Sequence, residues 1–348
     1  MKYSIIIPVF NRPDEVDELL ESLTRQSVQD FEVLVVEDGS DVRCEDVAER
    51  YADRMTVHYH EKKNSGPGPT RNYGAECSMG EYLIVLDSDV VLPEGYLQAV
   101  DEELTAHPCD AFGGPDRAHE SFTAIQKAIN YSMTSFFTTG GIRGSQKKKL
   151  DKFYPRSFNM GMRRSLYSQL NGFSPMRFGE DIDLSIRMYK SGAQVRLFPN
   201  AWVWHKRRTD LQKFFRQVHN SGIARINLYK KHPESLKLVH LLPALFTIGM
   251  FALLLTFVIG LLCLCSPSSR HVGSMLCLCS ALPVVLYKML IFTDSAIRNR
   301  SLKVGLLSIP ASFVQLIGYG TGFLRAWWLR CVCGRNEELQ AFRKTFYK

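Results

Sequence analysis

The chain lacks the features that mark secreted and zinc-stabilised proteins. Its nine cysteines include no Cys-x-x-Cys spacing, which excludes a structural zinc site of the usual kind. Two of the three Cys-x-Cys pairs lie within apolar runs, where cysteine serves as a small apolar side chain, and this usage fits reducing conditions. The first residues lead directly into a predicted strand, with too short an apolar region for a signal peptide. We therefore expect the front of the chain to stay in the cytosol.

Acidic residues are outnumbered by basic ones, and the formal net charge is +8. The excess is concentrated in Lys147-Lys148-Lys149, Arg163-Arg164, Lys206-Arg207-Arg208 and Lys230-Lys231. Such clusters attract nucleic acid, anionic lipid or a phosphorylated substrate. No nucleic-acid-binding module and no internal repeat is recognisable, so we expect lipid and a phosphorylated substrate as partners, and no nucleic acid. The glycine- and lysine-rich segment 140–149 is expected to be a mobile loop near substrate or anionic lipid.

Three long apolar runs occupy the C-terminal third of the chain: residues 241–265, 272–292 and 304–324. The first and third carry no charge, and the second is interrupted only by Lys288. Each run is long enough to span a bilayer, and three in succession are not expected of buried core helices. The sequence therefore predicts an integral membrane protein, with a transmembrane region over residues 238–330 and a polar tail over 331–348.

Basic residues set the expected orientation of these spans. Residues 206–237, before the first run, and Arg298 and Arg300, between the second and third, are rich in positive charge and should face the cytosol, as in an inner or plasma membrane protein. After three spans the tail, with Arg325 and Arg330, would lie on the opposite side, against the same rule. Either one segment is re-entrant or interfacial, or the tail is an exception.

Before the apolar runs, predicted strands and helices alternate. Strands are expected over 4–10, 31–36, 56–60 and 82–86, and helices over 14–26, 42–52, 69–77 and 94–106. This alternation predicts an α/β fold, Rossmann-like, with a mostly parallel sheet and helices on both faces. We assign residues 1–232 to this cytosolic domain. Apolar side chains recur at helical spacing among basic ones in 205–232, which favours an interfacial helix or, alternatively, a core-facing amphipathic one.

Acidic and polar side chains follow three of the predicted strands. The first strand contains Pro8 and ends at Asn11, the second ends at Asp38, and the fourth ends at Asp87-Ser88-Asp89. Ligands bind beyond the carboxyl ends of strands in such sheets, where Asp38 can accept hydrogen bonds from a base or ribose. The two carboxylates of the triplet suit a divalent cation that carries phosphate oxygens. The alternative is that these residues form surface turns and merely end the strands.

A glycine-rich segment, residues 64–72, lies between the second and fourth strand ends. Glycines let the backbone approach a phosphate, and the helix that follows offers free amides at its start. Arg71 falls in the first turn of this helix and carries a planar guanidinium suited to a base edge or a phosphate. The position of the segment between two acidic strand ends strengthens its interpretation as a phosphate-binding loop.

Two further groups complete the candidate site. Gly179-Glu180-Asp181 opens a predicted helix, where the acids either cap the helix or one of them removes a proton from an attacking hydroxyl. Burial and crowded negative charge would raise the pKa of such a carboxyl group toward the working pH. His205 closes a short predicted strand and either joins Asp89 as a metal ligand or is an ordinary surface histidine.

Five ordered segments resemble the successive signatures of family 2 glycosyltransferases, which have the GT-A fold: residues 4–12, 36–41, 66–74, 87–89 and 179–187. The resemblance covers about residues 2–230. It implies an inverting transfer of a sugar from a nucleotide-diphosphate donor, UDP- or GDP-linked, assisted by Mg²⁺ or Mn²⁺. Two positions depart from the pattern: Glu37 replaces a frequent aspartate, and residues 217–220 lack the Gln-x-x-Arg-Trp motif of processive enzymes.

The resemblance also implies a role for each matching residue. The donor would be bound by Pro8, Asn11, Asp38, Arg71, Asp87 and Ser88. Asp89 would hold the metal, and Asp181, with Glu180 beside it, would be the catalytic base. We therefore expect a membrane-anchored transferase that acts on a hydroxyl of a lipid-linked or glycan acceptor, in cell-surface polysaccharide or glycolipid synthesis.

Three alternatives stay open. A polyprenyl-phosphate sugar synthase would transfer to a lipid phosphate, which needs no base. A nucleotidyltransferase uses a similar sheet, but the basic signature loop expected near its N-terminus is missing and it has little reason to span a membrane. A catalytically silent membrane scaffold would keep the fold, although acids stand at every expected position.

Overall fold

The computed structural model describes residues 1–117, 122–140 and 153–339. Contacts divide the chain into two compact units, one formed by the described residues of 1–120 and 149–206, the other by those of 121–148 and 207–346. The division that the sequence suggests, 1–232 against 238–330, stays a prediction. Most of the expected loop at 140–149, with its lysine run, and residues 340–348 of the expected tail lie outside the described residues.

The first unit is built on a seven-stranded sheet with the order β3-β2-β1-β4-β8-β6-β9. Its strands are β1 (Tyr3–Val9), β2 (Phe31–Asp38), β3 (Thr56–Lys62), β4 (Tyr82–Leu86), β6 (Ala111–Gly113), β8 (Asn159–Arg163) and β9 (Val195–Leu197). Strands β3, β2, β1 and β4 are parallel, β8 is antiparallel to β4 and β6, and β6 is parallel to β9. The predicted mostly parallel α/β sheet is confirmed.

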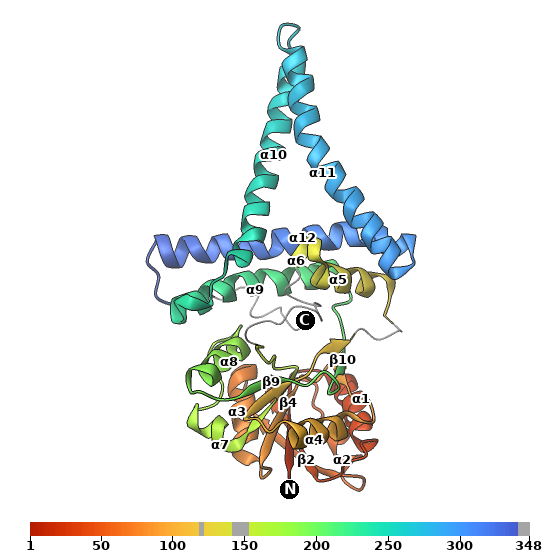
Figure 1. The fold of residues 1–348 in the computed structure, drawn as a ribbon, viewed down its shortest axis with the longest axis vertical. Coiled ribbons are helices and arrows are strands. Elements are labelled where there is room, and N and C mark those ends of the chain that lie inside the picture. The colour runs from red at the N-terminus through yellow and green to blue at the C-terminus, as the bar shows by residue number, and fades with distance from the viewer. Residues whose placement is uncertain (118–121, 141–152, 340–348) are drawn as a thin grey trace. The chain divides into compact units, whose positions relative to one another are not determined.

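Helices cover both faces of this sheet (Figure 1). They are α1 (Pro13–Thr24), α2 (Glu45–Glu49), α3 (Pro67–Cys77), α4 (Tyr96–Ala106), α7 (Arg164–Gln169) and α8 (Glu180–Lys190). Alternate residues of β1 enter different cores: Ile5 and Ile7 pack with α1, α2 and α4, whereas Ile6 packs with α3, α7 and α8. The two-residue period of a strand thus buries both faces of one apolar run.

One glycine sets how closely α3 approaches the sheet. A Cβ on Gly74 would come within 2.6 Å of the Cγ2 atom of Ile6 and 3.1 Å of that of Val36. The helix can therefore lie against β1 and β2 only because no side chain stands at this position. This packing holds the start of α3, with Arg71, above the strand ends.

The polar strand ends lie side by side, because β2, β1 and β4 are neighbours in the sheet. A second, three-stranded sheet extends this edge, with the order β5-β10-β7, formed by β5 (Val90–Val91), β10 (Val203–His205) and β7 (Asp116–Arg117). Its antiparallel register pairs His205 with Val90. A histidine more than a hundred residues away is thereby carried to the triplet that follows β4.

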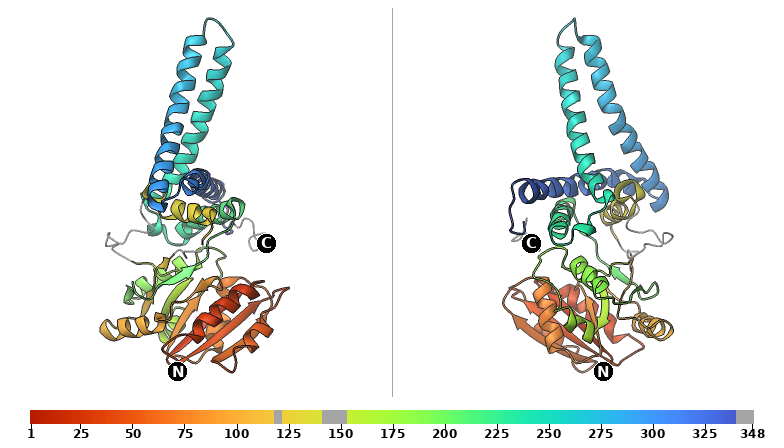
Figure 2. Two further views of the ribbon diagram at one scale, coloured as in Figure 1. Left: turned by 90° about the vertical axis from the view of Figure 1, so that its right-hand side faces the viewer. Right: turned by 60° about the vertical axis from the view of Figure 1, so that its left-hand side comes forward.

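The second unit is entirely helical in its described part. It contains α5 (Ala124–Thr134), α6 (Phe136–Thr139), α9 (Leu211–Lys231), α10 (Leu242–Leu264), α11 (Arg270–Asn299), α12 (Leu302–Trp327) and the π-helical turn Trp328–Val332. Helices α10 and α11 form a hairpin, and α12 lies crosswise at its open end beside α9 and α5 (Figures 1 and 2). Three of its segments, residues 238–264, 270–299 and 302–332, are long and apolar enough to cross a membrane.

Candidate active site

The first cluster at the sheet edge joins Asp87, Asp89 and His205. One ligand atom from each lies within 4.8 Å of the others, which is close enough for all three to hold one cation. His205 Nε2 is 3.2 Å from Asp89 Oδ1, and its Nδ1 is 4.0 Å from Asp116 Oδ2. Two carboxylates with one imidazole suit Mg²⁺ or Mn²⁺, and the nitrogen ligand favours Mn²⁺. The donor set therefore fits the metal that the sequence predicts.

Arg12 shares this cluster and was not predicted as a site residue. Its Nη1 donates to Asp89 Oδ2 at 2.8 Å, from the loop that follows β1. Asp89 is therefore flanked by a guanidinium on one oxygen and an imidazole on the other. The signal in the sequence was the position of Arg12, directly after the polar end of the first strand.

Arg71 links this cluster to the acids of α8. Its Nη2 donates to Asp87 Oδ1 at 2.8 Å and its Nη1 to Glu180 Oε1 at 2.9 Å, while the side chain stacks on Phe173. Burial alone would lower the pKa of Arg71, but the two carboxylates outweigh it and raise the pKa above its usual range. Burial raises the pKa of Glu180 to about 7, assisted by Asp181 and opposed by Arg71. The buried Arg71 thus stays charged between Asp87 and Glu180.

Asp181, the predicted base, lies against Arg156. The Nε atom of Arg156 donates to Asp181 Oδ2 at 2.6 Å, and the amide of Ile182 donates to Oδ1 at 2.8 Å. Burial would raise the pKa of Asp181, but these partners outweigh it and hold the pKa below its ordinary value. The expected rise in pKa is therefore found at Glu180 and not at Asp181, because only Asp181 pairs with Arg156.

Asp183, two residues further on, has a structural role. It is fully buried, and its Oδ2 accepts from Arg187 Nε at 2.9 Å, one turn along α8. Arg187 in turn donates to the carbonyls of Leu170 and Gly172. The pair fixes α8 to the loop before it, and this leaves Glu180 and Asp181 as the acids of the helix that face the site.

Asp38 organises the glycine-rich segment. Its Oδ1 accepts from Lys62 Nζ and from the amide of Ser65, and its Oδ2 accepts from the amide of Gly66, each at 2.8 Å. Gly66 has a φ of 98°, a backbone conformation that favours glycine. Asp38 therefore shapes the loop that leads into α3. A direct contact with a nucleobase stays a prediction.

The remaining predicted donor-binding residues lie at the same edge. Asn11, at φ 53°, accepts at its Oδ1 from the amides of Asp41 and Val42, which ties the loops after β1 and β2 together. Pro8 is half-buried in β1, and Ser88 is buried between the two aspartates. The structure thus gathers these residues at the carboxyl edge of the sheet.

A mostly parallel sheet with acids and guanidinium groups at its carboxyl edge fits the GT-A class of nucleotide-sugar-dependent transferases. Residues 4–170 match the model described as glycosyl transferase family 2. Residues 4–170 therefore form a glycosyltransferase family 2 domain, as the ordered motifs indicate.

Curated relatives agree with this assignment. The chain is 25% identical over 203 residues to the uncharacterized glycosyltransferase EpsJ of Bacillus subtilis, covering 56% of this chain and 58% of that protein. It is 29% identical over 241 residues to the pre-mycofactocin glycosyltransferase of Mycobacterium tuberculosis, covering 66% and 48%. The match thus spans only about half the length of these curated relatives.

The fold is similar to that of a mannosyltransferase from Pyrobaculum calidifontis, solved with GDP-Man and Mn²⁺. The TM-score is 0.56 at 14% identity, with 93% of this chain and 87% of that chain covered. At this identity the likeness concerns the fold alone.

Proposed function

We propose that the protein is a membrane-anchored, inverting glycosyltransferase that moves a sugar from a UDP- or GDP-linked donor to a hydroxyl of a lipid-linked or glycan acceptor. The observation that carries the proposal is the continuous chain of charged groups from Asp89 and Asp87 through Arg71 to Glu180 and Asp181. This row of charged groups offers a place for the donor diphosphate at one end and a proton acceptor at the other. The GDP-Man and Mn²⁺ bound by the Pyrobaculum enzyme support a donor and a cation of this kind.

The donor end of the row is the metal cluster. Asp87, Asp89 and His205 would hold the divalent cation, which when bound neutralises charge on the donor diphosphate. The glycine-rich segment, held by Asp38, and the start of α3 offer backbone amides to the nucleotide. Asp87 keeps Arg71 beside this cluster, so its buried positive charge stabilises the leaving nucleoside diphosphate.

The acceptor end of the row is Asp181. The acceptor oxygen attacks the anomeric carbon from the face opposite the diphosphate, while its proton passes to the Asp181 carboxylate. The bond from the anomeric carbon to the diphosphate breaks, and its electron pair leaves with the nucleoside diphosphate, so the anomeric configuration inverts. A lowered pKa keeps Asp181 ionised and ready to accept a proton at neutral pH.

The position of Arg156 favours a second candidate function, that of a polyprenyl-phosphate sugar synthase. Its guanidinium is partly exposed, with 38% of the side chain accessible, and it lies at the predicted base. A guanidinium at this place suits an acceptor phosphate, which would replace Asp181 as its partner. Such an acceptor is already ionised and needs no base.

The experiment measures nucleoside diphosphate release by the full-length, detergent-solubilised protein across UDP- and GDP-sugars, with and without Mn²⁺ or Mg²⁺. We expect metal-dependent release from one donor and its loss in Asp89→Ala. Asp46→Asn, an exposed acid in the first turn of α2, is the control that should keep full activity. A protein that binds no donor would instead be the silent scaffold.

The Asp181→Asn variant distinguishes a hydroxyl acceptor from a phosphate acceptor. If the acceptor is a hydroxyl, the variant should lose about 10²–10⁴-fold in rate while still binding the donor. If it transfers to a polyprenyl phosphate at the wild-type rate, the synthase is correct and our first proposal is wrong. The anomeric configuration of the product, read by NMR, tests inversion in both cases.

Membrane anchoring is part of the same proposal. The three long apolar helical segments and the basic residues around them support an integral protein of the inner or plasma membrane, with its catalytic unit in the cytosol. Retention in the membrane pellet after a carbonate wash is the expected result. Release into the supernatant would remove this part of the proposal and leave the chemistry standing.

A further inference from the structure

The arrangement of α10, α11 and α12 bears on how often the chain crosses the membrane. We infer that α12 is not a membrane span but lies in the plane of the membrane surface together with α9, and that only the α10–α11 hairpin crosses the bilayer. The inference rests on the membrane anchoring proposed above. It identifies the surface formed by α12, α9 and the base of the hairpin as one that binds the lipid interface.

The first observation is the direction of the helices. Helices α10 and α11 run side by side, with Gly260 and Gly273 in close backbone contact near the tip. Helix α12 lies across their open end in Figure 1 and in both views of Figure 2. Helix α12 contacts α5, α9, α10 and α11. A hairpin that stands upright in the bilayer therefore leaves α12 parallel to the membrane surface.

The second observation is the close pairing of α12 with α9. A Cβ on Gly322 would lie 2.1 Å from the carbonyl oxygen of His219, and one on Gly222 would lie 2.2 Å from that of Tyr319. Further along, Arg330 Nη1 donates to Asn227 Oδ1 at 2.8 Å. The contacts advance together along both helices, from Gly318 beside Val218 to Arg330 beside Asn227, so α9 and α12 run parallel and side by side.

This pairing makes a transmembrane α12 costly. Helix α9 carries five basic residues: Lys213, Arg216, Arg225, Lys230 and Lys231. If α12 crossed the bilayer, α9 would be carried in with it, and each arginine near the centre would cost about 2.5–3.5 kcal/mol. Arg216 and Arg225 are about 13 Å apart along the helix axis, so no depth keeps both at one headgroup layer of an upright α9. A helix pair in the membrane plane removes this cost.

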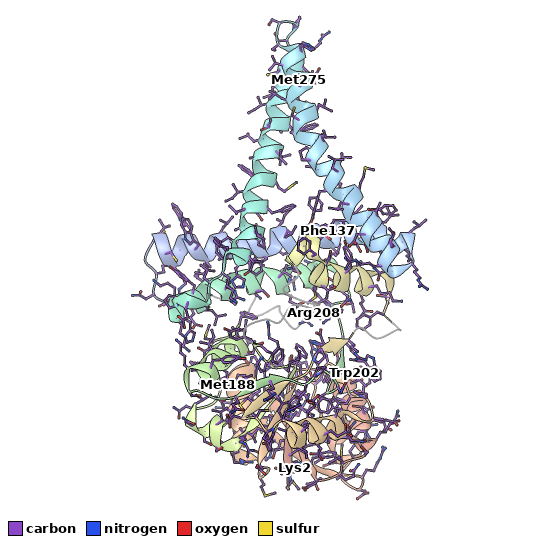
Figure 3. The ribbon with its side chains drawn as sticks, in the orientation of Figure 1. Lys2, Phe137, Met188, Trp202, Arg208 and Met275 are labelled. Carbon is purple, nitrogen blue, oxygen red and sulfur yellow. The ribbon has the colours of Figure 1, made fainter. Side chains whose placement is uncertain are left out.

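The third observation is burial. In the most apolar stretches of α10 and α11 only 6% and 11% of residues are buried, and their side chains point outward, as Met275 does (Figure 3). The corresponding figure for α12 is 39%. Its buried residues include Ser308 and Ser312, and Ser308 hydrogen-bonds to Ser295 of α11. Helix α12 is thus a packed layer within the unit, whereas the hairpin presents its apolar surface for lipid.

Polar contacts mark where the hairpin leaves the hydrocarbon. Asp294, near the end of α11, accepts from Tyr131 of α5 at 2.7 Å and from Arg298 at 2.9 Å. Trp327 and Trp328 are exposed at the end of α12, where indole rings suit the headgroup layer. The 23 residues of α10 span about 35 Å, which is enough for the hydrocarbon core.

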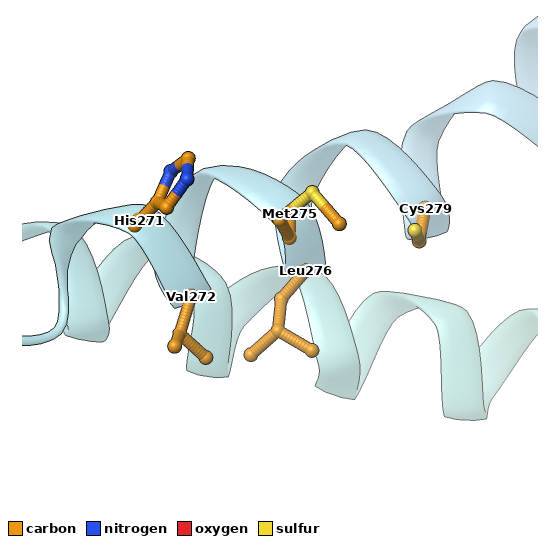
Figure 4. Close-up of a pocket in the computed structure, with 5 residues that line it drawn as sticks. All are labelled: His271, Val272, Met275, Leu276 and Cys279. Carbon is orange, nitrogen blue, oxygen red and sulfur yellow. The ribbon is translucent and has the colours of Figure 1, made fainter.

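The far end of the hairpin carries a shallow apolar hollow on α11. It is lined by His271, Val272, Met275, Leu276 and Cys279 (Figure 4).

Arg270 is the arginine of the turn between α10 and α11, whereas the other end of the hairpin is rich in basic residues. With two spans, Arg298, Arg300, Arg325 and Arg330 all fall on the side of the catalytic unit, as the positive-inside rule requires.

Native cysteines provide the test, with an impermeant maleimide applied to intact cells that express the full chain. Three variants are made, and each keeps one exposed cysteine while the other exposed or half-buried cysteines are replaced by serine. The cysteines kept are Cys77 in the first unit, Cys265 at the hairpin tip and Cys333 beyond α12. We expect labelling of Cys265 alone, and labelling of Cys77 and Cys333 only after the cells are permeabilised.

Labelling of Cys333 together with Cys265 in intact cells would show a third span and overturn the inference. If the serine substitutions prevent membrane insertion, fusions to the C-terminus of the unaltered chain decide instead. A fluorescent protein should then be bright and an alkaline phosphatase inactive, and the reverse pattern would overturn the inference. Loss of the whole protein in a carbonate wash would count against the anchoring itself, which is a different result.

Discussion

Arg156 donates a hydrogen bond from Nε to Oδ2 of Asp181 at 2.6 Å, so the predicted base is paired with a cation. The neighbouring Glu180 is paired with Arg71 instead, and burial raises its pKa to about 7 although Arg71 opposes the rise. Two adjacent carboxyl groups in one helical turn therefore differ in proton affinity, because burial dominates at Glu180 and is outweighed by Arg156 and the amide of Ile182 at Asp181.

Removal of Arg156 should shift the pH profile of the reaction. In Arg156→Ala the pKa of Asp181 rises, because burial is then no longer outweighed, and the acid limb of kcat/KM moves to higher pH by about 1–3 units. The measurement is kcat/KM against pH with the donor that the nucleoside diphosphate release assay selects. Arg163→Ala is a matched control, since Arg163 has 37% of its side chain exposed and pairs with an acid on the surface. An unmoved acid limb would show that Asp181 is not the titrating base.

Glu180 should make stability depend on pH. Its folded-state pKa is raised from 4.5 to about 7, so between these values the folded protein binds more protons than the unfolded chain. Stability therefore falls as pH rises from 4.5 to 7, by up to ~3 kcal/mol, and levels off above this window. Glu180→Gln should flatten this part of the dependence. Thermal unfolding midpoints of both proteins at closely spaced pH values check it, and parallel curves would contradict it.

His205 should tune the affinity for the cation. In His205→Gln the two aspartates remain while the imidazole is lost, and we expect the Mn²⁺ concentration for half-maximal activity to rise about 10–100-fold. Maximal activity at saturating Mn²⁺ should fall much less. His107→Gln, an exposed histidine at the end of α4, serves as the control. An unchanged Mn²⁺ requirement would remove His205 from the metal site.

Gly322 should be intolerant of any side chain. Its Cβ would lie 2.1 Å from the carbonyl oxygen of His219, so Gly322→Ala must push α12 away from α9, at a cost of about 1–3 kcal/mol. Gly249→Ala in α10 meets nothing within 4 Å and is the matched control. The midpoint of heat-induced aggregation in detergent should fall for the first variant and hold for the second. Equal midpoints would mean that the two helices are not closely packed.

Much of the catalytic unit could be predicted from local signals. The run Tyr82–Leu86 and the alternation around it predicted the strands, and their parallel pairing explains why Asp38 and Asp87 end at one edge. The five motifs predicted the family. Partners across long sequence distances could not be predicted in this way. Arg12 on Asp89 and Arg156 on Asp181 depend on how loops return to the sheet, and no local pattern encodes that.

The sequence by itself determined the order of strands and helices, the acids at the strand ends and the three apolar runs, because each follows from residue period and composition over a short window. Only the tertiary structure decided which carboxylate faces which guanidinium, and hence the different pKa values of Glu180 and Asp181. It also decided the direction of α12. The apolar composition of a helix determines how favourable its transfer out of water is. The orientation of α12 is set instead by the surface it packs against, here the basic helix α9.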